Sequence, residues 1–228
     1  MHQKLKWNAI GLVRKSKILH TTISEEKANL PSSHSKLHRK IQGFLEELTN
    51  LLQTMEKIQL ELIPKLESVF RLKFETPELV MLALARPSIR NIYEDLETHF
   101  KPQLNNPLKP EEYKELAASG DAANVLALIG DSVLDLGIVQ LLWDSSISTV
   151  DKLTKQRANT VANENLAKFC DKWDLFNYRL KRQKIPTEDS AKEETVIHEK
   201  GTLVEVIYGV IYLEFGFDEL IRTLPFIQ

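Results

Sequence analysis

Cysteine is almost absent from this sequence, which has one such residue, Cys170, among 228. A single thiol excludes an intramolecular disulfide and a metal site built from several cysteines, and it favours a reducing, cytoplasmic setting. Long apolar runs are also missing, because none reaches the roughly 18 uninterrupted residues of a membrane span, and no signal-peptide pattern opens the chain. Eight glycines and nine prolines are too few for a collagen-like or low-complexity chain. We therefore expect a globular protein without a membrane partner.

The formal net charge of −2 conceals a strong asymmetry along the chain. Residues 1–41 contain nine Lys or Arg against two acidic residues, so the remainder is acidic. We interpret residues 1–33, which end in a Pro-Ser-Ser stretch, as a basic N-terminal arm that either contacts a polyanion or is simply solvated. The candidate contacts in this arm are Lys4, Lys6, Arg14, Lys15 and Lys17.

Apolar residues recur every 3.5 positions in the next segment, which predicts an amphipathic heptad helix at residues 34–63 that ends at Pro64. The repeating positions are Leu37, Ile41, Phe44, Leu48, Leu51, Met55, Ile58 and Leu62. Such a seam needs a partner but does not identify it. Packing against the chain's own domain and a dimerising coiled coil both remain open, and in the second case the protein is a helical dimerisation module.

The remaining sequence predicts further helices and no convincing strand, so the expected fold class is all-α. Residues 122–143 and 200–215 are apolar on nearly every side, which is typical of buried helices. Residues 65–92 predict two helices, with Pro77 in the first turn of the second one. Residues 150–170 predict another helix. Residues 93–120 are expected to be a long polar loop with at most one short helix, and 180–199 an exposed charged loop. Residues 64–228 are expected to form one helical domain.

The few polar residues of the two apolar segments share helix faces. Asn124, Asp131 and Asp135 have spacings of seven and four residues, and Thr202 lies three residues before Glu205. Buried carboxylates must meet a cation, a set of hydrogen-bond donors or each other, because an unpaired buried charge costs several kcal/mol.

A glycine accompanies each key acid, with Gly130 directly before Asp131 and Gly209 one turn after Glu205. Glycine inside a helix costs about 1 kcal/mol relative to alanine, so a close approach of the two backbones is its expected role. If the helices cross there, the two carboxylates face one another and repel unless a divalent cation or a proton lies between them. Oxygen ligands favour Mg²⁺ or Mn²⁺. The alternative is a salt bridge to a cation of the intervening helix, such as Lys155 or Arg157.

At these residues the sequence resembles the ribonuclease III family. Residues 126–134, LALIGDSVL, resemble the family signature LEFLGDAVL, and residues 153–157, LTKQR, resemble its LTKxR pattern. Residues 202–214, TLVEVIYGVIYLE, resemble its last motif, DxFEALIGAIYLD. Residues 86–88, Arg-Pro-Ser, stand where the family usually has a Thr-His-x-Ser stretch. The resemblance covers roughly residues 64–220.

The resemblance implies a homodimer of all-α domains that forms a valley for double-stranded RNA. It also implies that Asp131 and Glu205 are catalytic and hold Mg²⁺ or Mn²⁺, whose bound water attacks a phosphodiester during RNA processing. Ala127 and Thr202 stand where the full bacterial site has two more acids, a pattern similar to the short Mini-III ribonucleases. Asp135 has either an outer role at this site or a place on the solvent or dimer face.

The missing acids leave two functional hypotheses. The first is a divalent-metal-dependent endoribonuclease, which rests on Asp131 and Glu205. The second is a catalytically silent scaffold with the same fold that binds structured RNA or a ribonucleoprotein, which rests on Ala127, Thr202 and the acidic body. In both cases phosphate contacts are expected from the basic loop before the last apolar helix, at Lys181, Arg182 and Lys184.

Overall fold

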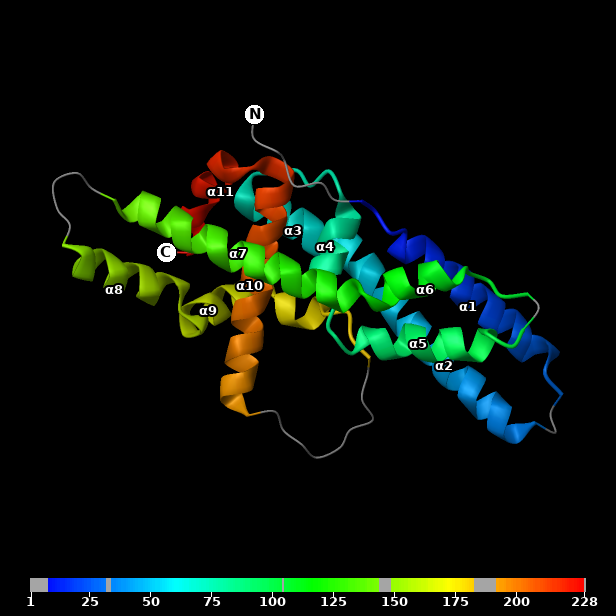
Figure 1. The fold of residues 1–228 in the computed structure, drawn as a ribbon. Helices are drawn as coiled ribbons and strands as arrows, with labels where there is room; N and C mark the ends of the chain where they lie inside the picture. Colours follow the sequence, from blue (N-terminus) through cyan, green and yellow to red (C-terminus); the bar gives the residue numbers. More distant parts are fainter. Residues whose placement is uncertain (1–7, 32–33, 104, 144–148, 183–191, 228) are drawn as a thin grey trace.

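A computed structural model describes residues 8–31, 34–103, 105–143, 149–182 and 192–227, and its regular structure is helical (Figure 1). Within these ranges the β pairing is one isolated parallel bridge between Ala85 and Leu180, so the all-α prediction is confirmed. In chain order the elements are α1 (Leu12–Asn29), α2 (Ser35–Lys57), the π turn η1 (Ile58–Leu62), α3 (Ile63–Phe70), α4 (Pro77–Ala83), α5 (Ile89–Phe100), α6 (Pro110–Ala117), α7 (Ser119–Leu142), α8 (Val150–Val161), α9 (Asn163–Trp173), the 3-10 turn η2 (Leu175–Tyr178), α10 (Glu193–Phe215), α11 (Phe217–Thr223) and the 3-10 turn η3 (Leu224–Ile227).

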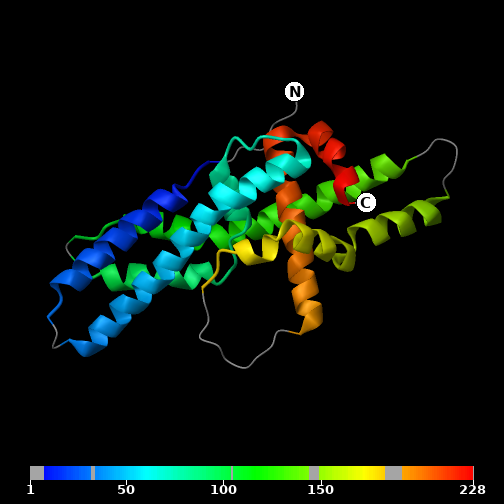
Figure 2. The ribbon, with the colours of Figure 1, turned by 180° about the vertical axis from the view of Figure 1, so that it is seen from behind.

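The two most apolar helices, α7 and α10, cross at the centre of an elongated molecule (Figures 1 and 2). Helices α1, α2, α5 and α6 lie together at one end, and α8 lies beside the C-terminal half of α7 at the other. Helix α7 also has the length and composition of a membrane span, although core helices commonly meet the same criterion. One hydrophobic core extends from Leu12 to Ile227, so the expected divisions at residues 33 and 63 do not separate independent cores.

The N-terminal segment is not an arm, because residues 12–29 form α1 and pack into the core. Leu12, Leu19 and Ile23 are completely buried, at spacings of seven and four residues that place them on one helix face. The other positions of α1 are largely polar, which obscured this short apolar stripe in the sequence. Lys4 and Lys6 lie outside the residues that the structure describes.

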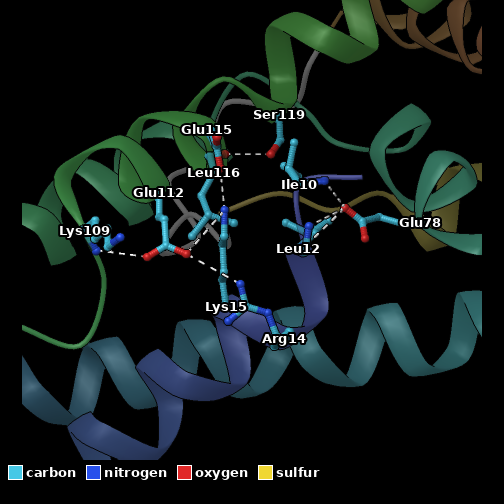
Figure 3. Close-up of polar contacts among 11 residues, drawn as sticks. Ile10, Leu12, Arg14, Lys15, Glu78, Lys109, Glu112, Glu115, Leu116 and Ser119 are labelled. Atoms are coloured by element: carbon cyan, nitrogen blue, oxygen red, sulfur yellow. Dashed lines mark hydrogen bonds and ion pairs between the residues drawn. The ribbon is translucent and has the colours of Figure 1, made fainter. Parts of the chain in front are cut away.

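Charged contacts attach the start of α1 to α6 (Figure 3). Lys15 is only 4% exposed and pairs with Glu115, with its Nζ also 3.8 Å from Glu112 Oε1. Arg14 Nη2 lies 3.5 Å from the same Glu112 oxygen. Two of the proposed polyanion contacts are therefore engaged within the chain, while Lys17 remains exposed.

The first turn of α1 is capped by a distant carboxylate, that of Glu78 in the first turn of α4 (Figure 3). Its Oε1 accepts the backbone N–H groups of Ile10 and Gly11 at 2.8 Å and that of Leu12 at 3.3 Å. These donors have no partner within the helix, and negative charge is favourable at a helix N-terminus.

Glu78→Ala is expected to lower the free energy of unfolding by about 1–2 kcal/mol, because it removes this cap. The measurement is equilibrium urea denaturation, with Glu75→Ala as the control, since Glu75 is exposed just before α4. Equal stability of the two variants would contradict the assigned role of Glu78.

The heptad seam packs against its own chain. Its members from Ile41 to Leu62 are buried, and α1 and α5 lie against α2. A side-chain hydrogen bond between α1 and α2 joins His20 Nε2 and Thr49 Oγ1 at 3.0 Å. The seam is therefore covered within one chain, and the coiled-coil alternative is not what the structure shows.

Pro64 does not end the helix, contrary to expectation, because the backbone passes through η1 into α3. A proline inside a helix loses one N–H and its ring clashes with the carbonyl four residues earlier. The π turn widens the helix just before this position, and the Ile63 N–H bonds to the Ile58 carbonyl five residues back. The proline then occupies the first turn of α3.

Two further predictions were wrong in detail. Residues 93–120 were expected to form a long loop with at most one short helix, but both α5 and α6 occupy much of it, with Tyr93, Leu96 and Phe100 buried at helical spacing. The helix expected at 150–170 is broken at Ala162, whose extended ψ of 140° separates α8 from α9. The helix start at Pro77 is confirmed.

Candidate functional site

Helices α7 and α10 cross with their backbones in contact, at the glycines that the sequence singles out. A Cβ atom added to Gly130 would overlap the carbonyl oxygen of Glu205 and lie 2.5 Å from its carbonyl carbon. A Cβ atom on Gly209 would overlap the carbonyl oxygen of Leu126 in the same way. The close crossing predicted from the two glycines is therefore present, and it brings Asp131 and Glu205 to neighbouring positions.

Burial and neighbouring negative charges raise the pKa of both carboxylates at this crossing. Burial raises the pKa of Glu205 to about 7, and the negative charges of Asp131 and Asp135 contribute to the shift. Burial and Asp135 also raise the pKa of Asp131, against the opposing effect of Arg157. In the described part of the chain, neither Asp131 nor Glu205 forms an ion pair. The group is thus a partly desolvated negative site.

Salt bridges form beside the pair rather than within it. Arg157 of α8 donates from Nη1 to Asp135 Oδ2, and Lys155 Nζ donates to Asp151 at 2.9 Å along its own helix. The predicted salt bridge of Arg157 or Lys155 with Asp131 or Glu205 is therefore absent among the described residues. Asp135 Oδ1 is buried and lacks a hydrogen-bond partner there.

The donor set fits a divalent cation with few protein ligands. Two carboxylates at one crossing, with the unpartnered Asp135 oxygen nearby, offer the hard oxygen ligands that Mg²⁺ accepts while it keeps several waters. The positions of the two missing acids contribute little, since Ala127 has no donor atom and the Thr202 hydroxyl donates to the His198 carbonyl at 3.1 Å. No preformed cluster of three or more His, Cys, Asp or Glu occurs in the described ranges.

The three predicted RNA contacts have different surroundings. Lys181 is exposed. Arg182 is held by two acids, with Nε 2.6 Å from Glu47 Oε1 and Nη1 2.8 Å from Asp95 Oδ2. Lys184 lies outside the described residues. The structure therefore leaves Lys181 as the one described member of this set without an acidic partner.

Sequence reasoning missed a basic cavity next to the acidic site. It has a volume of about 980 Å³, and its lining includes the cations Arg86, Arg179, Lys181 and Arg182 together with Thr202, one turn before Glu205. Arg86 was singled out only as part of the Arg-Pro-Ser stretch. Arg179 and Arg86 are 93 positions apart in the chain, so no local pattern joins them.

An exposed apolar stripe runs along α7 next to the helix face that carries Asp131 and Asp135. Val125, Leu128, Leu136 and Trp143 are more than half exposed. At 100° per residue these four positions lie within about 80° of one another, and they border the face of Asp131 and Asp135. The acids thus lie at the edge of an apolar surface.

Comparisons with known proteins agree with the sequence motifs. Residues 124–216 match the family model of the ribonuclease III domain. Ribonuclease 3 of Natranaerobius thermophilus is 31% identical over 96 residues, which cover 41% of this chain and only 40% of that relative. A 2.2 Å crystal structure of the nuclease domain of ribonuclease III from Campylobacter jejuni is 24% identical with a TM-score of 0.45, covering 74% of this chain and 95% of that one.

Proposed function

We propose that the chain is an endoribonuclease that cleaves double-stranded RNA with a divalent cation, because residues 124–216 match the model of the ribonuclease III domain. The observation that supports this proposal is the meeting of Asp131 and Glu205 at the glycine crossing of α7 and α10. Burial and the charge of Asp131 disfavour the ionised form of Glu205, and a bound cation favours it.

Asp131 and Glu205 would hold Mg²⁺ or Mn²⁺. When bound, such a cation lowers the pKa of a coordinated water and stabilises charge on a phosphate. Asp135 pairs with Arg157 through Oδ2, and its Oδ1 is buried without a hydrogen-bond partner among the described residues, so this oxygen is a further candidate acceptor. The raised pKa of Glu205 means that protons compete with the cation, and binding therefore strengthens as the pH rises to about 7 and above.

The alternative function is a catalytically silent scaffold for structured RNA or a ribonucleoprotein. Ala127 and the internally bonded Thr202 hydroxyl favour it, because they leave two carboxylates where the full site has four. Under this hypothesis RNA binding persists without cleavage.

A cleavage assay separates these two functions. We expect a long perfect RNA duplex to be cut with Mg²⁺ or Mn²⁺, to remain intact in EDTA, and to remain intact with Asp131→Asn. The control is Asp121→Asn, an exposed acid at the start of the same helix that pairs with Arg90, which is expected to cut normally. RNA binding without cutting at any metal concentration would replace the nuclease with the scaffold.

A homodimer is the proposed assembly, with the apolar stripe of α7 as its interface. Ribonuclease III-family domains are generally dimeric, and the stripe offers a second copy of the chain an apolar surface beside the acids. Leu128→Asp is expected to shift the protein toward the monomer in sedimentation velocity. Leu60→Asp is the matched control, because Leu60 and Leu128 are both 67% exposed. Equal effects of the two changes, or none, would contradict this interface.

A further inference from the structure

The basic cavity is lined by four segments that the fold holds together: the residues after α4, Asn124 of α7, residues 176–182 and the first half of α10. Leu180 pairs with the segment after α4, donating to the Leu84 carbonyl at 2.9 Å and accepting from the Arg86 N–H at 2.8 Å. This short bridge places Arg86 beside Arg179 and Lys181. The first half of α10 forms the opposite wall, with His198, Glu199 and Thr202.

One carboxylate holds two guanidinium groups in this cavity. Glu199 Oε1 lies 3.0 Å from Arg86 Nε, and Glu199 Oε2 lies 2.9 Å from Arg179 Nη1. Arg179 is fixed further, because its guanidinium lies 3.2 Å above the Phe176 ring and its Nε donates to the Phe176 carbonyl at 2.6 Å. Both arginines are therefore ordered and largely buried before any ligand arrives.

The cavity retains an excess of positive charge. Glu47 and Asp95 neutralise Arg182 from outside, so among the described residues that line the cavity Glu199 is the one acid beside Arg86, Arg179 and Lys181. Burial lowers the pKa of Arg86 and of Lys181, and the charge of Arg179 lowers both further. Positive charges repel one another in a partly desolvated cavity, and an anion that binds between them relieves this repulsion.

We propose that Arg86, Arg179 and Lys181 bind a phosphate group of the RNA next to the Asp131–Glu205 pair, and that Glu199 is the counterion that holds the guanidiniums when no phosphate is present. This proposal rests on the proposed function, which supplies RNA as the ligand, and it adds a phosphate-binding site to that function. Thr202 lines the cavity one turn before Glu205, so a strand that reaches the carboxylates passes this basic wall. Two bidentate donors and an ammonium match the oxygens of a phosphate.

A purely structural ion-pair network makes the opposite prediction for Glu199. If Glu199 only ties α10 to the Arg86 segment, Glu199→Gln weakens RNA binding or leaves it unchanged. If Glu199 competes with phosphate for the same guanidiniums, Glu199→Gln tightens binding. The direction of this one effect therefore distinguishes the two roles.

The test measures binding of a fluorescent RNA duplex by anisotropy in EDTA, so that cleavage does not enter. Lys181→Gln is expected to weaken binding and to reduce the slope of log K against log salt by about 0.7–0.9, as for one lost phosphate contact. Glu199→Gln is expected to tighten binding and to steepen the slope. The controls are Lys65→Gln on α3 and Glu219→Gln on α11, where Glu219 also holds an arginine but lies outside the cavity. Thermal melting checks that each variant is folded.

Duplexes with a 5′-phosphate or a 5′-hydroxyl identify the source of the phosphate. A Lys181→Gln effect that requires the 5′-phosphate assigns a terminal monoester, and an effect equal on both assigns a backbone diester. An unchanged slope for Lys181→Gln, or no tightening with Glu199→Gln, overturns the proposal even if the protein cleaves RNA. The expected binding changes without any cleavage overturn the nuclease function and leave this site in place.

Discussion

Gly130→Ala is expected to lower the free energy of unfolding by at least about 3 kcal/mol, at the upper end of what overpacking usually costs. The added Cβ atom would overlap the Glu205 carbonyl, which is backbone, so no rotation of a side chain relieves the contact. Helix propensity alone predicts the opposite sign, because alanine is favoured over glycine by about 1 kcal/mol inside a helix. A large loss of stability would therefore indicate that the backbones of α7 and α10 are in contact at Gly130.

The measurement for Gly130→Ala is urea denaturation beside a matched control, Gly43→Ala in α2. A Cβ atom at Gly43 meets nothing within 4 Å, so that variant is expected to gain up to about 1 kcal/mol. If the Gly130 variant were as stable as the Gly43 variant, α7 and α10 would not cross as described.

Glu205→Gln is expected to reduce the proposed metal-dependent cleavage by at least about 100-fold, because it removes one of the two proposed carboxylate ligands.

The same change alters how the free energy of unfolding depends on pH. Glu205 has a pKa of about 7 in the folded protein, above the ordinary value of 4.5. Between these values the folded state binds a proton that the unfolded state lacks, so the wild-type free energy of unfolding falls as the pH rises from about 4.5 to about 7.

Glutamine carries no charge, so Glu205→Gln is expected to remove this pH dependence. Without metal, the variant should therefore melt above the wild type at pH 8 and close to it at pH 5. Mg²⁺ or Mn²⁺ at pH 8 should raise the melting temperature of the wild type and not that of the variant. The control is Glu111→Gln, an exposed position in the first turn of α6. A parallel pH dependence in wild type and Glu205→Gln would contradict the raised pKa.

The acidic site was accessible from the sequence because its geometry is encoded locally. Each of the two apolar helices carries its polar residues at helical spacing and a glycine that marks the contact. Two local patterns and one crossing therefore predicted the Asp131–Glu205 pair. The family motifs agree, and residues 124–216 match the ribonuclease III domain.

The features that sequence reasoning missed depend on contacts between distant residues. The basic character of α1 suggested a polyanion, but Lys15 meets Glu115 and Arg14 meets Glu112, each about 100 positions away. Arg182 was expected to contact phosphate, and it meets Glu47, 135 positions earlier. A charge pattern records which residues are ionised but not which of them become partners.

The π turn η1 shifts the sequence register of the buried positions in one long helix by one residue. Buried positions alternate in steps of three and four residues from Ile41 to Leu62, then move by a single residue to Ile63 before the alternation resumes at Leu66 and Phe70. In a regular α-helix one extra residue would rotate the later stripe by about 100°, whereas the wider turn, with its bond from Ile63 N–H to the Ile58 carbonyl, absorbs that residue. The segment before the turn thus packs on α1 and α5, and the segment after it brings Phe70 against Trp173 and Tyr208. In sequence terms, a single inserted residue lets one continuous helix join the N-terminal helices to the rest of the core without a loop.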